Sequence, residues 1–156
     1  MTLQIRSCKL DDFASIFSLF KQLWPNLELD YAGLYAVYAR ALSSEVQHLI
    51  VGVQEDRIVG FCSLSLKNNF WKPGCIGNVD ELVVDENYRG QGIGKKLINR
   101  IEEIAISNQC KQIELDSAFH RKEAHHFYES IGYKSRAYLF TKSLSKMSQT
   151  EGQAIT

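Results

Sequence analysis

Apolar and polar positions alternate in the first residues of the chain and then change to a helical period. Residues 3–5 alternate with polar neighbours, which predicts a short strand. From Phe13 to Leu23 the apolar residues recur at helical spacing, so an amphipathic helix is predicted, with an aspartate just before it as the N-cap. Pro25 ends this helix because proline disfavours helical backbone in the residue before it. A second helix is predicted over about 31–43.

The middle of the chain has the pattern of consecutive strands. Apolar runs at 48–54 and 58–66 are separated by a short polar segment, a spacing typical of a hairpin. A polar and aromatic loop over 67–75 precedes a strand predicted over 76–84. A glycine-rich segment follows and leads into an amphipathic helix that is expected to end near Asn108.

The last part of the chain predicts a strand over 112–117, a helix over about 123–131 and a final strand near 137–144. The element order is therefore β-α-α-β-β-β-α-β-α-β, without an internal repeat or a linker. This order predicts a mixed α/β fold in one domain, residues 1–145. The polar tail, residues 146–156, is expected to be disordered.

Length and charge limit the classes of function. A chain of 156 residues is a natural size for one domain with its own core. Lysine plus arginine equals aspartate plus glutamate, at 18 each, so the chain lacks the basic field that sequence-independent nucleic-acid binding uses. Apolar residues never run together for the ~18 positions of a membrane span. We therefore expect a cytoplasmic protein, without a targeting peptide, that binds neither nucleic acid nor a membrane.

The cysteines and histidines offer no clear metal site. Cys8, Cys62, Cys75 and Cys110 lie far apart without a CxxC pair, which disfavours a zinc knuckle or a disulfide scaffold and favours reduced thiols. Adjacent histidines at 125 and 126 would project in different directions from a helix, so no metal is expected. Cys75 has no histidine near it in sequence and is interpreted as a passive thiol.

The glycine-rich segment has the chemistry of an anion-binding turn. Gly90, Gly92 and Gly94 precede a helix, and the start of a helix carries unpaired N–H donors and a positive dipole end. The spacing does not fit a Walker A loop, because Lys96 stands in the place of the hydroxyl residue. It does not fit the dinucleotide fingerprint either, because Lys95 occupies the position of the third glycine.

Residues 81–98 resemble the acyl-CoA pyrophosphate loop of the GNAT superfamily of N-acetyltransferases, whose signature (Q/R)xxGx(G/A) follows a strand. A second family motif is matched at Ala124, Phe127, Tyr128, Gly132 and Tyr133, although Arg121 replaces its asparagine. The resemblance implies a single domain with a central, mostly antiparallel mixed sheet flanked by helices. Within the superfamily, the chain looks most similar to small-amine acetyltransferases, including the aminoalkylphosphonate group.

The resemblance also implies acetyl-CoA as the co-substrate and a set of residues that bind it. Main-chain amides on the strand before the loop would pair with the pantetheine arm, and the glycine turn would hold the pyrophosphate. The implied cofactor-binding residues are Leu82, Val83, Val84, Arg89, Gly90, Gln91, Gly92, Ile93, Gly94 and Lys95. Arg89 would either contact the pyrophosphate or pin the loop.

Three residues are candidates for catalysis. The resemblance implies that Tyr128 protonates the departing thiolate, whereas its alternative is a core aromatic beside Phe127. Asp80 or Glu81 would take the proton of the attacking amine. Because side chains alternate along a strand, only one of the two should face the acetyl group unless a bulge intervenes. Asn78 stands where the aminoalkylphosphonate group is expected to have an acid.

Acceptor specificity is expected in two segments, residues 24–31 and 67–75. Their aromatic side chains, together with Glu28, Asp30 and the two strand carboxylates, suit a small cationic amine or polyamine, while Lys67 and Lys72 suit an anionic phosphonate. Aminoglycosides, polyamines, aminoalkylphosphonates and peptide amines all remain open as acceptors. The alternative to an enzyme is a noncatalytic acetyl-CoA-binding sensor. A homodimer is common in the family and is expected on that ground.

Overall fold

The structure, a computed structural model, describes residues 2–145, so the predicted tail over 146–156 lies outside the described residues. Its contacts divide the chain into two compact units. The first unit holds the chain before Trp24 together with Leu29–Leu115, and the second holds Trp24–Glu28 and the chain from Asp116 onward.

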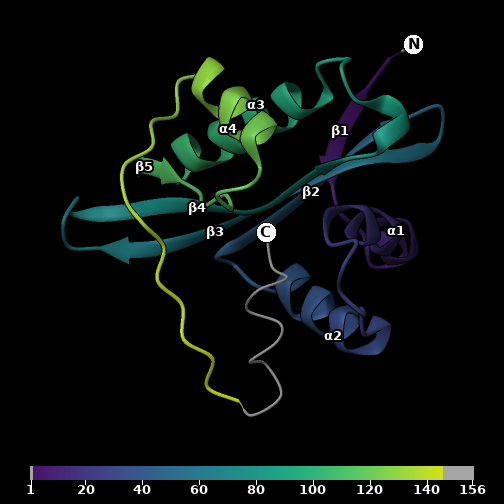
Figure 1. Cartoon of the computed structure of the whole chain (residues 1–156), viewed down its shortest axis with the longest axis horizontal. Helices are drawn as coiled ribbons and strands as arrows, with labels where there is room; N and C mark the ends of the chain where they lie inside the picture. The colour runs from purple at the N-terminus through teal and green to yellow at the C-terminus, as the bar shows by residue number, and fades with distance from the viewer. Residues whose placement is uncertain (1, 146–156) are drawn as a thin grey trace. The chain divides into compact units, whose positions relative to one another are not determined.

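The first unit is built on one five-stranded sheet with the order β1-β2-β3-β4-β5 (Figure 1). Neighbouring strands pair antiparallel from β1 to β4, and β5 pairs parallel with β4. This confirms the predicted mixed, mostly antiparallel sheet. The strands are β1 Gln4–Ser7, β2 Gln47–Gln54, β3 Arg57–Asn69, β4 Gly74–Val84 and β5 Cys110–Glu114.

Helices cover both faces of this sheet. Figure 1 shows α3 (Ile93–Ser107) on one face and α1 (Phe13–Leu23) with α2 (Tyr31–Leu42) on the other. Two short 3-10 turns, η1 (Leu10–Asp12) and η2 (Glu86–Tyr88), connect strands to helices. The three helices begin and end close to the positions that the apolar periodicity predicts.

The buried core lies between the sheet and these helices. Leu97, in the middle of the buried stripe of α3, packs so closely on Gly60 that a Cβ there would lie 2.8 Å from its Cδ1. On the opposite face, Phe20 of α1 meets Phe61 of β3 with ring centroids 5.3 Å apart. Alternate residues of β3 therefore face different helices, and this alternation assigns every strand position to one face of the sheet.

The two hairpins differ in how well the sequence predicts them. Glu55 and Asp56 have positive φ angles of 51° and 61°, which close the tight turn predicted between β2 and β3. The loop predicted over 67–75 is wrong in its bounds, because strand pairing continues to Asn69↔Gly74. Cross-strand hydrogen bonding extends the strands through residues that are polar or small and so lack an apolar strand pattern.

The second unit contains α4 (Lys122–Ser130), as predicted. The final strand predicted near 137–144 is wrong, because no strand is described there and its side chains are exposed, Phe140 at 91%. An alternating pattern favours an extended backbone, but a strand also needs a neighbour for its N–H and C=O groups. The strand predicted over 112–117 is also wrong in its bounds, since β5 runs from Cys110 to Glu114.

Asp12 connects β1 to α1 through hydrogen bonds. Its carboxylate accepts two bonds from the Arg6 guanidinium, at 2.8 and 3.0 Å, and a third from the backbone N–H of Lys9 at 2.7 Å. The bond with Arg6 is the main reason why the pKa of Asp12 is lowered, and burial opposes the shift. Asp12 is thus a buried, paired carboxylate in η1 that also caps the turn leading into α1.

We expect Asp12→Asn to lower the free energy of unfolding by about 1.5–3 kcal/mol at pH 7. A lowered folded-state pKa stabilises the fold above the unfolded pKa of about 3.9, and this contribution is lost as pH falls through the folded value. The difference between wild type and variant should therefore shrink below pH ~4 in urea denaturation. Asp11→Asn, at an exposed neighbour, is the control. A gap that stays constant down to pH 2 would contradict the role of the charge.

Candidate functional site

The glycine turn leaves the start of α3 without a side-chain cap. Gly92 is the N-cap residue with φ 81°, and Gly90 has φ 78°, both in the left-handed region that favours glycine. Apart from the adjacent residues of the chain, no described atom lies within 4 Å of the place where a Cβ would stand at either position. The first intrahelical bond is donated by Lys96 to the Gly92 carbonyl. The earlier N–H groups of the first turn are therefore available to an anion.

Side chains hold the turn on its strand. Arg89 donates from Nε to the carbonyl oxygen of Val84 at 3.0 Å, which fixes the turn to the end of β4. Asp85 accepts from the backbone N–H of Asn87, and Gln22 of α1 accepts from the N–H of Glu86, each at 2.9 Å. This contact is the one expected if Arg89 pins the loop, and a contact of Arg89 with a pyrophosphate stays a prediction.

One edge of β4 loses its pairing partner halfway along the strand. Pairing with β5 ends at Asn78↔Glu114, although pairing with β3 continues to Val84. The N–H groups of Glu81 and Asp85 point to β3, where they bond Ser63 Oγ and the Val59 carbonyl. Because N–H groups alternate along a strand, the amides of residues 82 and 84 point to the other edge, beyond the end of β5. That edge can accept an added extended chain.

A bulge in β4 lies at the same place. Ser63 pairs with Glu81 and the next residue of β3 pairs with Val79, so Asp80 is the extra residue. Asp80 accepts a hydrogen bond from the Asn78 side chain at 2.7 Å. Asn78 pairs with Ser65, which shares its sheet face with Ser63. The bulge therefore brings the side chains of Asp80 and Glu81 to one face. The sequence allowed this arrangement only if a bulge interrupts the strand.

Ser63 orients the carboxylate of Glu81. Its hydroxyl donates to Glu81 Oε1 at 2.7 Å and accepts from the backbone N–H of Glu81 at 3.0 Å. Ser63 is buried, whereas Glu81 is half-buried and Asp80 is exposed. The negative charge of Glu81 also contributes to the raised pKa of the Cys62 thiol, after burial, so Cys62 is a passive neighbour.

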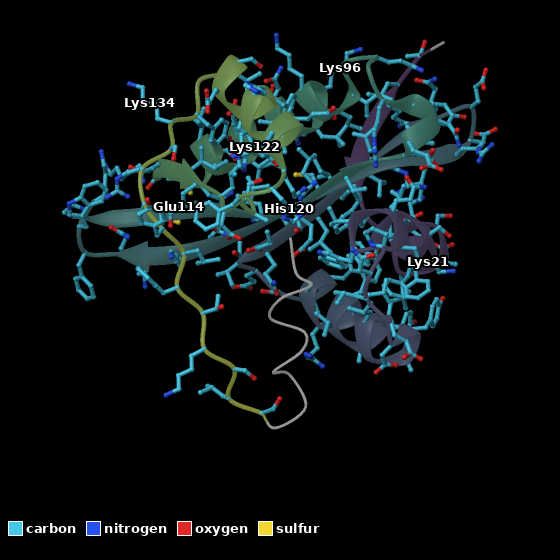
Figure 2. The ribbon with its side chains drawn as sticks, viewed as in Figure 1. Lys21, Lys96, Glu114, His120, Lys122 and Lys134 are labelled. Atoms are coloured by element: carbon cyan, nitrogen blue, oxygen red, sulfur yellow. The ribbon has the colours of Figure 1, made fainter. Side chains whose placement is uncertain are left out.

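A further ion pair lies on this polar face. Glu114, labelled in Figure 2, is the last residue of β5 and lies 3.4 Å from the ammonium of Lys67 on β3. Sequence reasoning missed both Ser63 and Glu114. The alternation Ser63-x-Ser65-x-Lys67 does signal one polar face on β3, but only the strand order assigns Glu114 to it.

Part of the acidic and aromatic lining predicted for an acceptor has another role. Asp30 is the N-cap of α2 and accepts from the backbone N–H of Gly33 at 3.1 Å. Tyr31 packs on the rings of Phe13 and Phe17, with centroids 5.1 and 4.8 Å away. The ring contacts of Tyr31 join α2 to α1, whereas the Asp30 hydrogen bond stabilises the start of α2.

Tyr128 lies in the second unit, half-buried on α4. Its ring contacts those of Phe127 and Tyr133, at centroid distances of 5.3 and 5.9 Å. The Tyr133 N–H also donates to the Tyr128 carbonyl at 3.0 Å, which closes the end of the helix. His125 bonds the Ala118 carbonyl at 2.8 Å, and residues 2–145 contain no group of three potential ligands that could hold a metal ion.

Known proteins resemble the chain over most of its length. The model of the Acetyltransferase (GNAT) family matches residues 13–133. The aminoalkylphosphonate N-acetyltransferase of Salmonella typhimurium is 33% identical over 141 residues, covering 90% of this chain and 91% of that protein. The glucosamine 6-phosphate N-acetyltransferase of Trypanosoma brucei brucei is 39% identical over 80 residues, about half of each chain (51% and 52%).

Solved structures share the fold. The aminoglycoside N-acetyltransferase AAC(6')-Iy, solved in complex with CoA, superimposes with a TM-score of 0.82 over 92% of this chain and 96% of that one, at 16% identity. An acetyltransferase from Trypanosoma brucei has a TM-score of 0.74 and 29% identity, over 92% of this chain and all of the other (100%). Within residues 2–145, no helix is long and apolar enough to cross a membrane.

Proposed function

The chain belongs to the GNAT family of N-acetyltransferases, which use acetyl-CoA, and we propose that it acetylates the primary amine of a small molecule by direct attack. The observation that carries this proposal is that three features lie next to one another, on β4 and at the start of the helix that follows it. The bulge at Asp80 presents carboxylates, no strand of the described sheet pairs with the neighbouring edge of β4 beyond Asn78, and a helix without a side-chain cap follows. Together they form places for an amine, an extended arm and an anion.

The residues of the first unit fit acetyl-CoA. The amides of Leu82 and Val84 would pair with the arm along the open edge, with Val83 holding the strand in the core. The N–H groups of the turn would bind the pyrophosphate, helped by the charge of Arg89. The turn residues proposed for this role are Gly90, Gln91, Gly92, Ile93, Gly94 and Lys95. Lys96 also lies in this first turn, exposed to solvent (Figure 2).

Bound acetyl-CoA supplies an activated acetyl group, and the protein must supply a neutral amine. An amine with a pKa near ~10 is only about one part in a thousand neutral at pH 7. We assign the removal of its proton to Glu81, because Ser63 holds that carboxylate in a fixed orientation. Asp80, exposed on the same face, would bind the ammonium group before the proton leaves. Orientation by the strand supplies proximity.

Tyr128 is proposed as the acid that protonates the leaving thiolate. The family motif around it supports this role, and a phenol with a pKa near ~10 can donate to a thiolate in the transition state. Its ring contacts with Phe127 and Tyr133 would fix its orientation. We place the whole reaction in one acetyltransferase domain, residues 1–145, and in the cytoplasm, where the four free cysteines would stay reduced.

Among small amines, we propose an acceptor that carries an anionic group, such as an aminoalkylphosphonate. Carboxylates at Asp80, Glu81 and Glu114 suit the ammonium end, and Lys67 suits a phosphonate. The relative from Salmonella typhimurium is named for such substrates. Polyamines and aminoglycosides form the second candidate class, which the excess of carboxylates over ammonium groups on this face favours. A homodimer remains a family-based expectation, which sedimentation would test.

The acceptor class predicts a pattern across matched amines. With acetyl-CoA, 2-aminoethylphosphonate should be acetylated with a kcat/KM at least roughly tenfold above ethanolamine, since a favourable charge contact is worth about 1–2 kcal/mol. Lys67→Ala should remove most of this preference while leaving ethanolamine unchanged. Product mass is the readout. Spermidine and an aminoglycoside belong in the same panel, and a preference for them would favour the second class. Absence of any acetylated amine would contradict the small-amine proposal.

The proton roles predict different pH–rate profiles. Glu81→Gln should lower kcat/KM by roughly 10²–10⁴-fold at pH 7, and the loss should shrink at high pH, where the ammonium group of the acceptor loses its proton without help. Asp80→Asn should mainly raise KM. Tyr128→Phe should lower kcat by roughly 10²-fold, whereas Tyr133→Phe, its matched control, should not. Full turnover of Tyr128→Phe across the pH range would exclude the acid role, and equal effects at residues 80 and 81 would exclude the assignment of Glu81.

A further inference from the structure

Two cysteines that are distant in sequence face each other at the start of β4 and β5. Cys75 and Cys110 are register partners in the parallel pair, and their sulfur atoms lie 3.5 Å apart. They are separated by 35 residues along the chain. The pair lies where β4 begins, whereas the open edge and the glycine turn lie where β4 ends. These thiols therefore take no part in the proposed acetyl transfer.

The pair is accessible from solvent. Both residues are half-buried and line an open cleft of about 440 Å³ together with Gly74, Asn108, Gln109 and Lys111. The ammonium-bearing chain of Lys111 passes close to Gly74 at this cleft. A small polar oxidant can thus reach the sulfur atoms.

The other two cysteines are poor competitors. Cys62 is fully buried, and burial raises the pKa of Cys8 to about 12. Burial also raises the pKa of Cys110, to about 11, and the hydrogen bond with Cys75 adds to this shift. The hydrogen bond between the two sulfur atoms, 3.5 Å apart, places Cys110 directly beside Cys75, where it can attack an oxidised Cys75.

We propose that Cys75 and Cys110 form a reversible disulfide when the protein meets a hydroperoxide. Neighbouring strands lie about 4.7–4.9 Å apart, and this spacing falls within the Cα separations of about 4.4–6.8 Å that disulfides span. The sulfur atoms must approach from 3.5 Å to about 2.05 Å, which side-chain rotation supplies. The closed loop, residues 75–110, would contain the open edge of β4, the glycine turn and α3.

The reaction balances with one hydroperoxide. The Cys75 thiolate attacks the terminal oxygen, the O–O bond breaks, and a sulfenic acid forms as the alcohol, or water, leaves with a proton. The Cys110 sulfur then attacks the sulfenic sulfur and expels hydroxide, which leaves as water with the thiol proton. Two electrons pass from the two sulfur atoms to the peroxide. A dithiol such as dithiothreitol restores both thiols by exchange.

Peptide mapping tests the proposal directly on the full chain. The four cysteines fall in separate tryptic peptides, and Cys75 and Cys110 lie in residues 68–89 and 101–111. After one equivalent of hydrogen peroxide and alkylation of the remaining thiols, we expect these two peptides to be linked, with Cys8 and Cys62 alkylated. The link should disappear with dithiothreitol. On a non-reducing gel the oxidised protein should run as a single chain, as the untreated protein does, because the link lies within one chain.

Serine variants separate pairing from general oxidation. In the Cys75→Ser and Cys110→Ser variants, the one remaining cysteine of the pair should either stay a thiol or be oxidised alone. Neither variant should give a linked peptide. In wild type, closing this loop should raise the Tm by roughly 5 °C or more, and neither variant should show the rise. The proposal would be overturned if Cys75 and Cys110 were alkylated as readily as in untreated protein, if either was oxidised without linkage, or if the link joined two chains.

Discussion

The architecture of the candidate site depends on a local break in the pairing of β4. Up to Asn78 this strand has a neighbour on each side, and beyond that residue only β3 remains bonded to it in the described sheet. The bulge at Asp80 lies at the break and changes the phase of the side chains. A regular strand would have sent the two consecutive carboxylates to opposite faces. The end of the pairing with β5 creates the open edge, and the bulge beside it creates the acidic face.

Helix α3 has two tasks that the sequence keeps separate. Its buried stripe packs against the sheet through residues such as Leu97 and Ile101, which anchors the helix. Its first turn lacks a side-chain cap, and Gly92 in the left-handed region connects it to the strand. A side chain that capped this turn would occupy the N–H donors that we propose bind the pyrophosphate. Stability comes from the middle of the helix, and the first turn can leave its donors to the proposed ligand.

The sequence predicts the features that arise from neighbouring residues. The strand–glycine–helix unit is local, because the apolar periods and Gly92 lie within a few residues of each other, and the structure confirms its elements. The bulge at Asp80 and the partnership of Ser63 with Glu81 depend on register between strands, which periodicity leaves open. The roles of the predicted site residues remain predictions.

Other outcomes also reflect contacts between distant segments. The strand predicted near 137–144 is wrong because an alternating pattern cannot provide a hydrogen-bonding partner. The contact of Cys75 with Cys110 could not be predicted from the sequence either, because parallel pairing joins residues that are far apart in the chain. Asp30 is the N-cap of its own helix, and its expected place in the lining of an acceptor site stays a prediction.

Calorimetric titration can test whether the glycine turn and the edge of β4 hold acetyl-CoA. Wild type should show saturable binding, and Gly92→Ala should measure the effect of backbone strain alone. Gly92→Glu adds a negative charge at the same place, so its affinity should be at least roughly tenfold below that of Gly92→Ala. Ala14→Glu, at an exposed position of α1, should bind like wild type. Equal affinities of the two Gly92 variants, or no binding by folded wild type, would contradict this role of the glycine turn.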